Sequence, residues 1–267
     1  WWRERTKGND IVAQRLVWDL GFLLGYKLSS RVSSKAHLGI EIRRYLDLPN
    51  DALSLPLMQG LDARLSRDLL PEMPGLQRGD ESVEANLTYA AIDVIASSGV
   101  AASSMTRIAR RARVSTGSVY PRFKSADALI HKSFETAIQT IVSRNMQMVS
   151  NRGISIDMYG VTINAGYGED RKVWRNFRTE VHVEAAHNVE LANFMASGFA
   201  QSTQFLLDSF IEFGVQEDVA VKIAWFLHSH AIGISIIHSI VSEVELYDNR
   251  VMARWLMQGL ISNRPVG

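Results

Sequence analysis

Apolar residues recur at intervals of three to four positions along most of the chain, and no run shows the alternation expected of a half-buried strand. This pattern predicts an all-α protein. The glycine-punctuated stretch 153–170 gives no clear pattern. Helices are predicted over residues 9–33, 52–65, three short segments within 82–123, and over 125–148, 171–187, 189–213, 217–243 and 247–262.

A weak internal repeat indicates two modules. Residues 10–18 resemble residues 217–225, and the sequence Leu-Met-Gln-Gly-Leu occurs both at 57–61 and at 256–260. The segment between the two modules holds two prolines and two glycines, a composition that is typical of a linker. We therefore predict that residues 1–69 form the tail of a first helical module, truncated at its start. Residues 70–81 are the predicted linker, and a nearly whole second module follows.

The segment from Ser82 to Phe123 reads as three helices. Gly99 is expected to end the first helix as a left-handed cap, Ser103 or Ser104 to begin the second, and Ser115 to begin the third. Two short helices joined by a tight turn form a helix-turn-helix, whose second helix can enter the major groove of DNA. The positions expected to be buried are Leu87, Ala90, Ala91, Val94, Ile95, Met105, Ile108, Ala112, Val119 and Phe123.

Charge supports this interpretation locally, although the net charge of the whole chain is only +1. Between Ser103 and Lys124 there are six basic residues and no acidic residue. A cluster of this kind neutralises phosphates and releases counterions, so double-stranded DNA is the predicted partner. The basic residues are Arg107, Arg110, Arg111, Arg113, Arg122 and Lys124.

The same segment resembles the TetR/AcrR family of one-component regulators. The resemblance covers residues 87–131 and is carried by Ile108-Ala109, Val114-Ser115, Gly117-Ser118-Val119-Tyr120, Phe123 and Ser125 through Leu129. It implies a three-helix DNA-binding domain followed by a helical-bundle domain for ligand binding and dimerisation, here in a tandem arrangement. The DNA-contacting residues that it implies are Ser104, Thr106, Arg107, Thr116, Gly117, Ser118, Tyr120 and Lys124. Charge and proximity add Arg122, and Arg107 is the expected specificity residue.

Three positions depart from the family pattern. Arg113 replaces a glycine in the turn, Pro121 lies inside the third helix, and Ala126 replaces a lysine. Proline removes a backbone donor and breaks or kinks a helix, so the recognition helix is expected to kink or end early. A second interpretation is therefore kept, in which the module senses a ligand or binds a protein and its helix-turn-helix is vestigial.

By this reading residues 82–131 are the DNA-binding domain and residues 132–267 the effector-binding and dimerisation domain. Histidines and serines within the apolar segment 219–241 predict a pocket for a small, largely apolar effector with a polar end. Small residues on the same segment suit a dimer interface, in a homodimer or between the two modules of one chain. The predicted effector-contacting residues are Trp174, Phe177, His182, Phe194, Phe199, Phe205, Trp225, His228 and Ile232.

Other classes of function find little support in the sequence. There is no cysteine, and His228 and His230 are two positions apart, so on a helix they point to different sides. We therefore predict no metal, no cofactor and no enzymatic activity. The apolar segment 219–241 carries a lysine and three histidines, which argues against a membrane helix. The chain is expected to be a cytoplasmic repressor.

Overall fold

The computed structural model describes Leu20, Leu24 and residues 82–152, 171–212 and 214–240. All regular secondary structure in these ranges is helical, which confirms the predicted fold class. The helices predicted over 9–33, 52–65 and 247–262 lie outside the described ranges, apart from the two leucines. The elements are α5 (Val83–Ser98), α6 (Met105–Ala112), η3 (Thr116–Ser118), α7 (Ala126–Arg152), α9 (Lys172–Ala185), α10 (Val189–Glu212) and α11 (Glu217–Ile240).

Serine side chains begin the helices of this segment. Of the two serines predicted to cap α6, Ser104 accepts a hydrogen bond from the amide of Arg107, and Ser103 does not. The Ser82 hydroxyl accepts one from the amide of Ala85, a cap that the sequence analysis did not predict. These bonds satisfy backbone donors that the first helical turn leaves unpaired. Gly99 ends α5 with φ 80° and ψ 164°. This is a glycine-specific conformation but not the left-handed helical one that we expected.

Helix α5 is buried on two faces and contributes to two hydrophobic cores. One face packs with α6, η3 and the start of α7 around Leu87, Ile108 and Val119. The other packs with α7, α9 and α10 around Ile95, Phe177 and other buried residues. We call α5, α6 and η3 the three-helix unit. Because α5 belongs to both cores, this unit is joined to the rest of the described chain by apolar packing.

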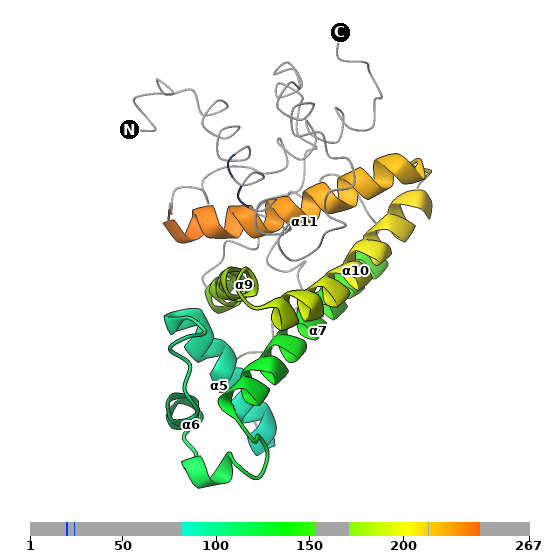
Figure 1. Cartoon of the computed structure of the whole chain (residues 1–267). Coiled ribbons are helices and arrows are strands. Elements are labelled where there is room, and N and C mark those ends of the chain that lie inside the picture. Colours follow the sequence, from blue (N-terminus) through cyan, green and yellow to red (C-terminus); the bar gives the residue numbers. More distant parts are fainter. Residues whose placement is uncertain (1–19, 21–23, 25–81, 153–170, 213, 241–267) are drawn as a thin grey trace.

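Helix α9 lies between α5 and α11, while α7 and α10 run beside each other away from the three-helix unit (Figure 1). The close approach of α7 and α10 depends on Gly198, since a Cβ there would lie 2.7 Å from Cγ2 of Ile138. Within the described ranges, no helix is both long enough and apolar enough to cross a membrane.

Candidate nucleic-acid interface

A left-handed residue makes the turn between α6 and η3. Arg113 has φ 57° and ψ 41°, and its amide donates to the carbonyl oxygens of Ala109 and Arg110. This is the conformation that a glycine would adopt without a steric penalty. Arginine pays a steric cost in this conformation, and the turn nevertheless brings Ser115 to the start of the next element.

The tip of the interface is a short cap at Ser115. Its hydroxyl accepts a hydrogen bond from the amide of Ser118 and lies 2.8 Å from the Ser118 hydroxyl. Thr116 and Gly117 between them are exposed. A Cβ added at Gly117 would meet only the Ser115 hydroxyl, at 3.7 Å. The fold itself therefore does not require glycine here, and the missing side chain leaves room for an approaching surface.

The third helix is shorter than the sequence pattern suggested. It is a single 3-10 turn, Thr116–Ser118, followed by hydrogen-bonded turns rather than by an α-helix. The amides of Arg122 and Phe123 both donate to the carbonyl oxygen of Val119. Pro121 has no amide to donate, which prevents a continuous helical ladder at this point. The apolar anchors are as predicted, since Val119 and Phe123 are buried.

The DNA-contacting residues predicted from the sequence lie at the start of α6, on η3 and in the turns after η3; α6 and η3 are in contact and together form what is here called the α6–η3 corner. All of them are exposed except Ser118, which is partly buried. Tyr120 is 61% exposed, which is unusual for a large aromatic side chain. The exposed members are Ser104, Thr106, Arg107, Thr116, Gly117, Tyr120, Arg122 and Lys124.

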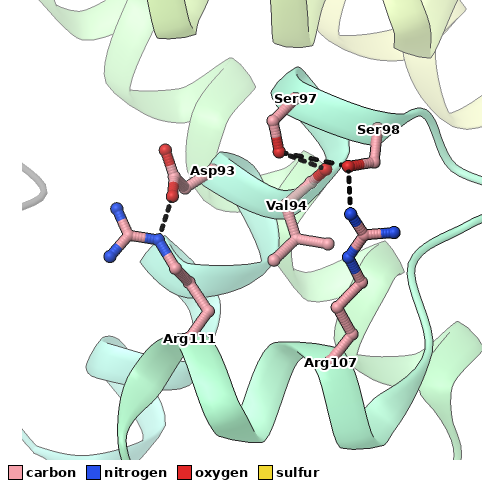
Figure 2. Close-up of polar contacts among 6 residues, drawn as sticks. All are labelled: Asp93, Val94, Ser97, Ser98, Arg107 and Arg111. Atoms are coloured by element: carbon pink, nitrogen blue, oxygen red, sulfur yellow. Dashed lines mark hydrogen bonds and ion pairs between the residues drawn. The ribbon is translucent and has the colours of Figure 1, made fainter.

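Two arginines of α6 are held by side chains of α5 (Figure 2). Nη2 of Arg107 donates to the Ser98 hydroxyl at 2.7 Å, and Nε of Arg111 forms an ion pair with the Asp93 carboxylate. Sequence reasoning missed Ser98 and Asp93, because the partners are 9 and 18 positions apart and share no local motif. The arginine expected to give specificity is thus oriented by the end of α5.

Another arginine stabilises the tip itself. Nη1 of Arg122 donates to the Ser118 carbonyl oxygen at 2.8 Å. This bond satisfies a carbonyl at the end of η3, where no further helical turn supplies an amide. Arg110, Arg113 and Lys124 are also exposed. The uncharged tip, Thr116-Gly117, is therefore flanked along the chain by exposed basic residues on both sides.

The predicted effector-contacting residues are distributed over two environments. Trp174 and Phe177 are buried in the core that joins α9 to α5, α7 and α10, whereas His182, His228 and Ile232 lie on α9 and α11. Phe194 contacts the His131 ring at a centroid distance of 4.6 Å, and Phe205 is partly buried. Phe199 and Trp225 lie on α10 and α11, and their side chains are not among those that the structure describes.

Helix α9 also reaches the end of α5 directly. A Cβ at Gly99 would lie 3.1 Å from Oε2 of Glu180. Gly99 directly follows Ser98, which holds Arg107. Helix α9 thus lies next to the end of α5 that bears the hydrogen-bond partner of Arg107.

Comparison with known proteins gives a consistent result. Residues 87–132 match the family model described as bacterial regulatory proteins of the tetR family. A transcriptional regulator from Rhodococcus sp. Rha1 has a similar structure, with a TM-score of 0.56 and 21% identity, covering 67% of this chain and 94% of that one. A second Rhodococcus protein, described as a TetR-family transcriptional regulator, gives a TM-score of 0.52 and 16% identity, covering 67% and 97%. No curated protein gives a significant match.

Proposed function

We propose that this chain, a TetR-family protein by its segment 87–132 and by its fold, is a one-component transcriptional repressor. Its α6–η3 corner binds operator DNA, and a small, largely apolar effector in the helical half modulates that binding. The observation that carries the proposal is the exposed tip at Thr116-Gly117, capped by Ser115 and flanked along the chain by exposed basic residues. The first residues of a recognition element face base edges in this geometry, while the surrounding cations contact phosphates.

Selection of bound sequences from random duplex DNA, with the full chain, tests the proposal. We expect a sequence with two related half-sites whose centres are about 34–36 Å apart, one turn of the duplex. Binding should weaken steeply as salt is added, because each phosphate contact releases counterions. Recovery of sequences without any consensus, at non-specific affinity, would contradict operator recognition.

Gly117→Ala is the sharpest single variant for the tip. The space around Gly117 accepts a methyl group, so the stability of the fold should change little. If the tip lies against base pairs, the added methyl group should lower operator affinity about tenfold or more, comparable to the loss of one specific base contact. Lys172→Ala, an exposed residue of α9, is the matched control and should leave operator affinity unchanged.

Tyr120→Ala and Arg107→Ala probe the phosphate contacts and the predicted specificity residue. Both should weaken operator binding. Only Arg107→Ala should relax the preference at one base pair, because arginine pairs with guanine through two hydrogen bonds. Equal loss on all sequences in both variants would assign Arg107 to phosphate contact instead.

The shortness of η3 favours a second candidate function, a ligand-sensing or protein-interaction module that does not bind an operator. The 3-10 turn offers fewer groove-facing positions than a full recognition helix, and Pro121 follows it where such a helix would continue. Pro121→Arg separates the two functions. Specific DNA binding that arises only in this variant would favour the vestigial module, whereas specific binding by the parent chain supports the repressor.

Coupling between the halves is proposed to run through α9. The buried contacts of α9 with α5, together with the approach of Glu180 to Gly99, support this route. An effector that displaces α9 would shift α5, and with it the Ser98 hydroxyl that orients Arg107. Such a ligand changes operator affinity only by its difference in affinity for the two arrangements.

The dimerisation face of α11 is proposed to pair within one chain, with the first helical module predicted over residues 1–69. Ala220, Ala224, Leu227 and Ile234 of α11 are buried in the single chain, so this face is not free for a second copy. The first module predicted from the internal repeat is the proposed partner of this face. Sedimentation or light scattering should therefore give the mass of a monomer, and a dimer mass would contradict the intramolecular arrangement.

A further inference from the structure

Helix α5 supplies a polar partner to each of two arginines on one face of α6 (Figure 2). Arg107 and Arg111 are four positions apart on α6, so they lie on the same face of the helix, about 6 Å apart along its axis. The Ser98 hydroxyl accepts a hydrogen bond from Nη2 of Arg107 at 2.7 Å, and the Asp93 carboxylate forms an ion pair with Nε of Arg111. The two arginines therefore differ in the charge of their partner, which is neutral for Arg107 and negative for Arg111.

The ion pair changes the balance of charge at the proposed DNA-binding surface. The segment from Ser103 to Lys124 holds six basic residues and no acidic residue. Among the described residues, Arg111 is the only one of these six with a carboxylate partner. The Arg111 side chain is 54% exposed and that of Asp93 is 20% exposed, so the pair lies at the surface of the molecule. The fold thus brings an acidic residue from outside the segment to compensate one of its six charges.

A duplex that contacts Arg107 also comes close to Arg111. Duplex DNA carries one phosphate charge for about every 1.7 Å of its axis, so phosphates adjoin both positions when it lies against this face of α6. A phosphate in contact with Arg111 would lie within one Debye length, about 8–10 Å, of the Asp93 carboxylate and would be repelled by it. Because the pair as a whole is neutral, it gives no net attraction for phosphate.

We propose that Asp93 withholds Arg111 from the phosphates of DNA and so limits the sequence-independent part of DNA affinity. Asp93 is a positioning residue, because it acts through Arg111 and does not itself contact DNA. Ser98 holds Arg107 without cancelling its charge, and a guanidinium carries further donors on Nε and Nη1 for DNA. This inference rests on the proposed binding of duplex DNA, and it assigns opposite roles to two arginines that the sequence pattern treats alike.

Fluorescence anisotropy of a labelled duplex, titrated with the full chain at several salt concentrations, tests the role of Asp93. The parent chain and Asp93→Asn are compared on two duplexes of equal length, the selected operator and a random sequence. Asp93→Asn should steepen the slope of log affinity against log salt by about 0.9, and should raise affinity by up to about eightfold in about 0.1 M salt, as expected for one added phosphate contact. Both duplexes should gain equally, because phosphate contacts carry no sequence information.

Three further variants assign the effect to the charge of Asp93. Asp93→Glu keeps the charge and should behave as the parent chain. Addition of Arg111→Gln to Asp93→Asn removes the released cation and should return the slope to that of the parent. Glu212→Gln removes an equal charge at the exposed end of α10, away from the three-helix unit (Figure 1), and should leave the slope unchanged. Circular dichroism checks that each variant is folded.

The sign of the change in Asp93→Asn decides between two roles of the ion pair. A shallower slope and a lower affinity would overturn the proposal, because Asp93 would then hold Arg111 in place for a phosphate contact. An unchanged slope would also overturn it, since no cation would have been withheld. The reciprocal variant Ser98→Asp places a carboxylate beside Arg107 and should make the slope shallower by about 0.9. An unchanged slope in this variant would overturn the contrast between the two arginines.

Failure of this inference and failure of the proposed repressor function give different results. Operator selection with the parent chain tests the repressor alone. A consensus operator together with an unchanged salt slope in Asp93→Asn would overturn only the role of Asp93. Selection without a consensus, together with a steeper slope of Asp93→Asn on the random duplex, would retain the role of Asp93 in a protein that binds DNA without specificity. Absence of binding to any duplex, by parent and variants alike, would overturn both.

Discussion

The interior of the three-helix unit and the interior between α9 and α11 are built from different residues. The first is almost entirely apolar, around Leu87, Ile108 and Val119. Its buried polar residues, Thr88 and Ser103, donate to backbone carbonyls four residues earlier. The second interior contains an arginine, histidines and serines. The residues in question are Arg178, His182, His228, Ser229, His230 and Ser235.

This difference separates an interior that fixes helix packing from one that carries titratable groups. An apolar core with local polar contacts fixes the crossing of α5 and α6, on which the geometry of the exposed tip depends. Buried polar groups lower the stability of the fold unless they are hydrogen-bonded. The core shared by α5, α7, α9 and α10 joins the two regions, so a shift of the helices in one region displaces residues that pack against the other.

The pH dependence of stability should show the largest effect, and it belongs to the polar interior. The pKa values of His182, His228 and His230 fall from 6.5 to about 4, 3 and 3, with burial as the main cause. Below pH 6.5 the unfolded chain binds protons that the folded chain does not. Stability should therefore be greatest above this pH and fall toward pH 4, by up to about 1.4 kcal/mol per pH unit for each histidine.

Urea unfolding at several pH values measures this loss. His230→Gln should reduce the slope of the free energy of unfolding against pH by the contribution of one histidine. His187→Gln, which changes an exposed histidine, should leave this slope unchanged. A free energy of unfolding that stays constant between pH 6.5 and pH 5 would show that the buried histidines are not desolvated as described.

Truncation in the apolar core should have the next largest effect. Ile108 is fully buried, so Ile108→Ala removes packed methyl groups and leaves a cavity. The expected loss is about 2–5 kcal/mol in the free energy of unfolding, measured by urea denaturation. Val189→Ala, at a residue that is 76% exposed, is the control and should change stability by less than about 0.5 kcal/mol. Similar effects of the two variants would mean that the unit lacks a tightly packed core.

The close contact between α7 and α10 gives a smaller, two-sided test. Gly198→Ala places a methyl group against Cγ2 of Ile138, with an expected penalty of about 1–3 kcal/mol. The better helix propensity of alanine offsets about 1 kcal/mol of this. Ile138→Ala removes the overlapping atom, so the double variant should lose less stability than the sum of the single variants. Additive losses would contradict the contact.

The strained turn should give the smallest change. Arg113→Gly relieves the steric cost of a left-handed residue, which is about 1–2 kcal/mol. The extra conformational freedom of glycine in the unfolded chain offsets part of this gain in stability. We expect a net gain below about 1 kcal/mol in thermal or urea unfolding. Arg110→Gly, inside α6, is the matched control and should lower stability by about 1 kcal/mol. If both variants lower the free energy of unfolding, Arg113 is not strained in this turn.

Much of the three-helix unit could be predicted because its signals are local. The caps at Ser104 and Ser115, the end of α5 at Gly99 and the buried positions of each helix follow from spacing within a few residues. The third helix was predicted less well. The pattern through Val119 and Phe123 suited an α-helix, but Pro121 removed an amide and limited η3 to one 3-10 turn.

The sequence by itself determined the helices, their caps and the concentration of positive charge around the turn, because helical periodicity and capping act over three or four residues. Tertiary structure decided which side chains meet. Arg107 meets Ser98 across nine positions, Arg111 meets Asp93 across 18, and Arg178 meets Ala231 across 53. Helix packing sets such contacts through the burial of whole faces, and no local pattern encodes which polar residues these faces bring together.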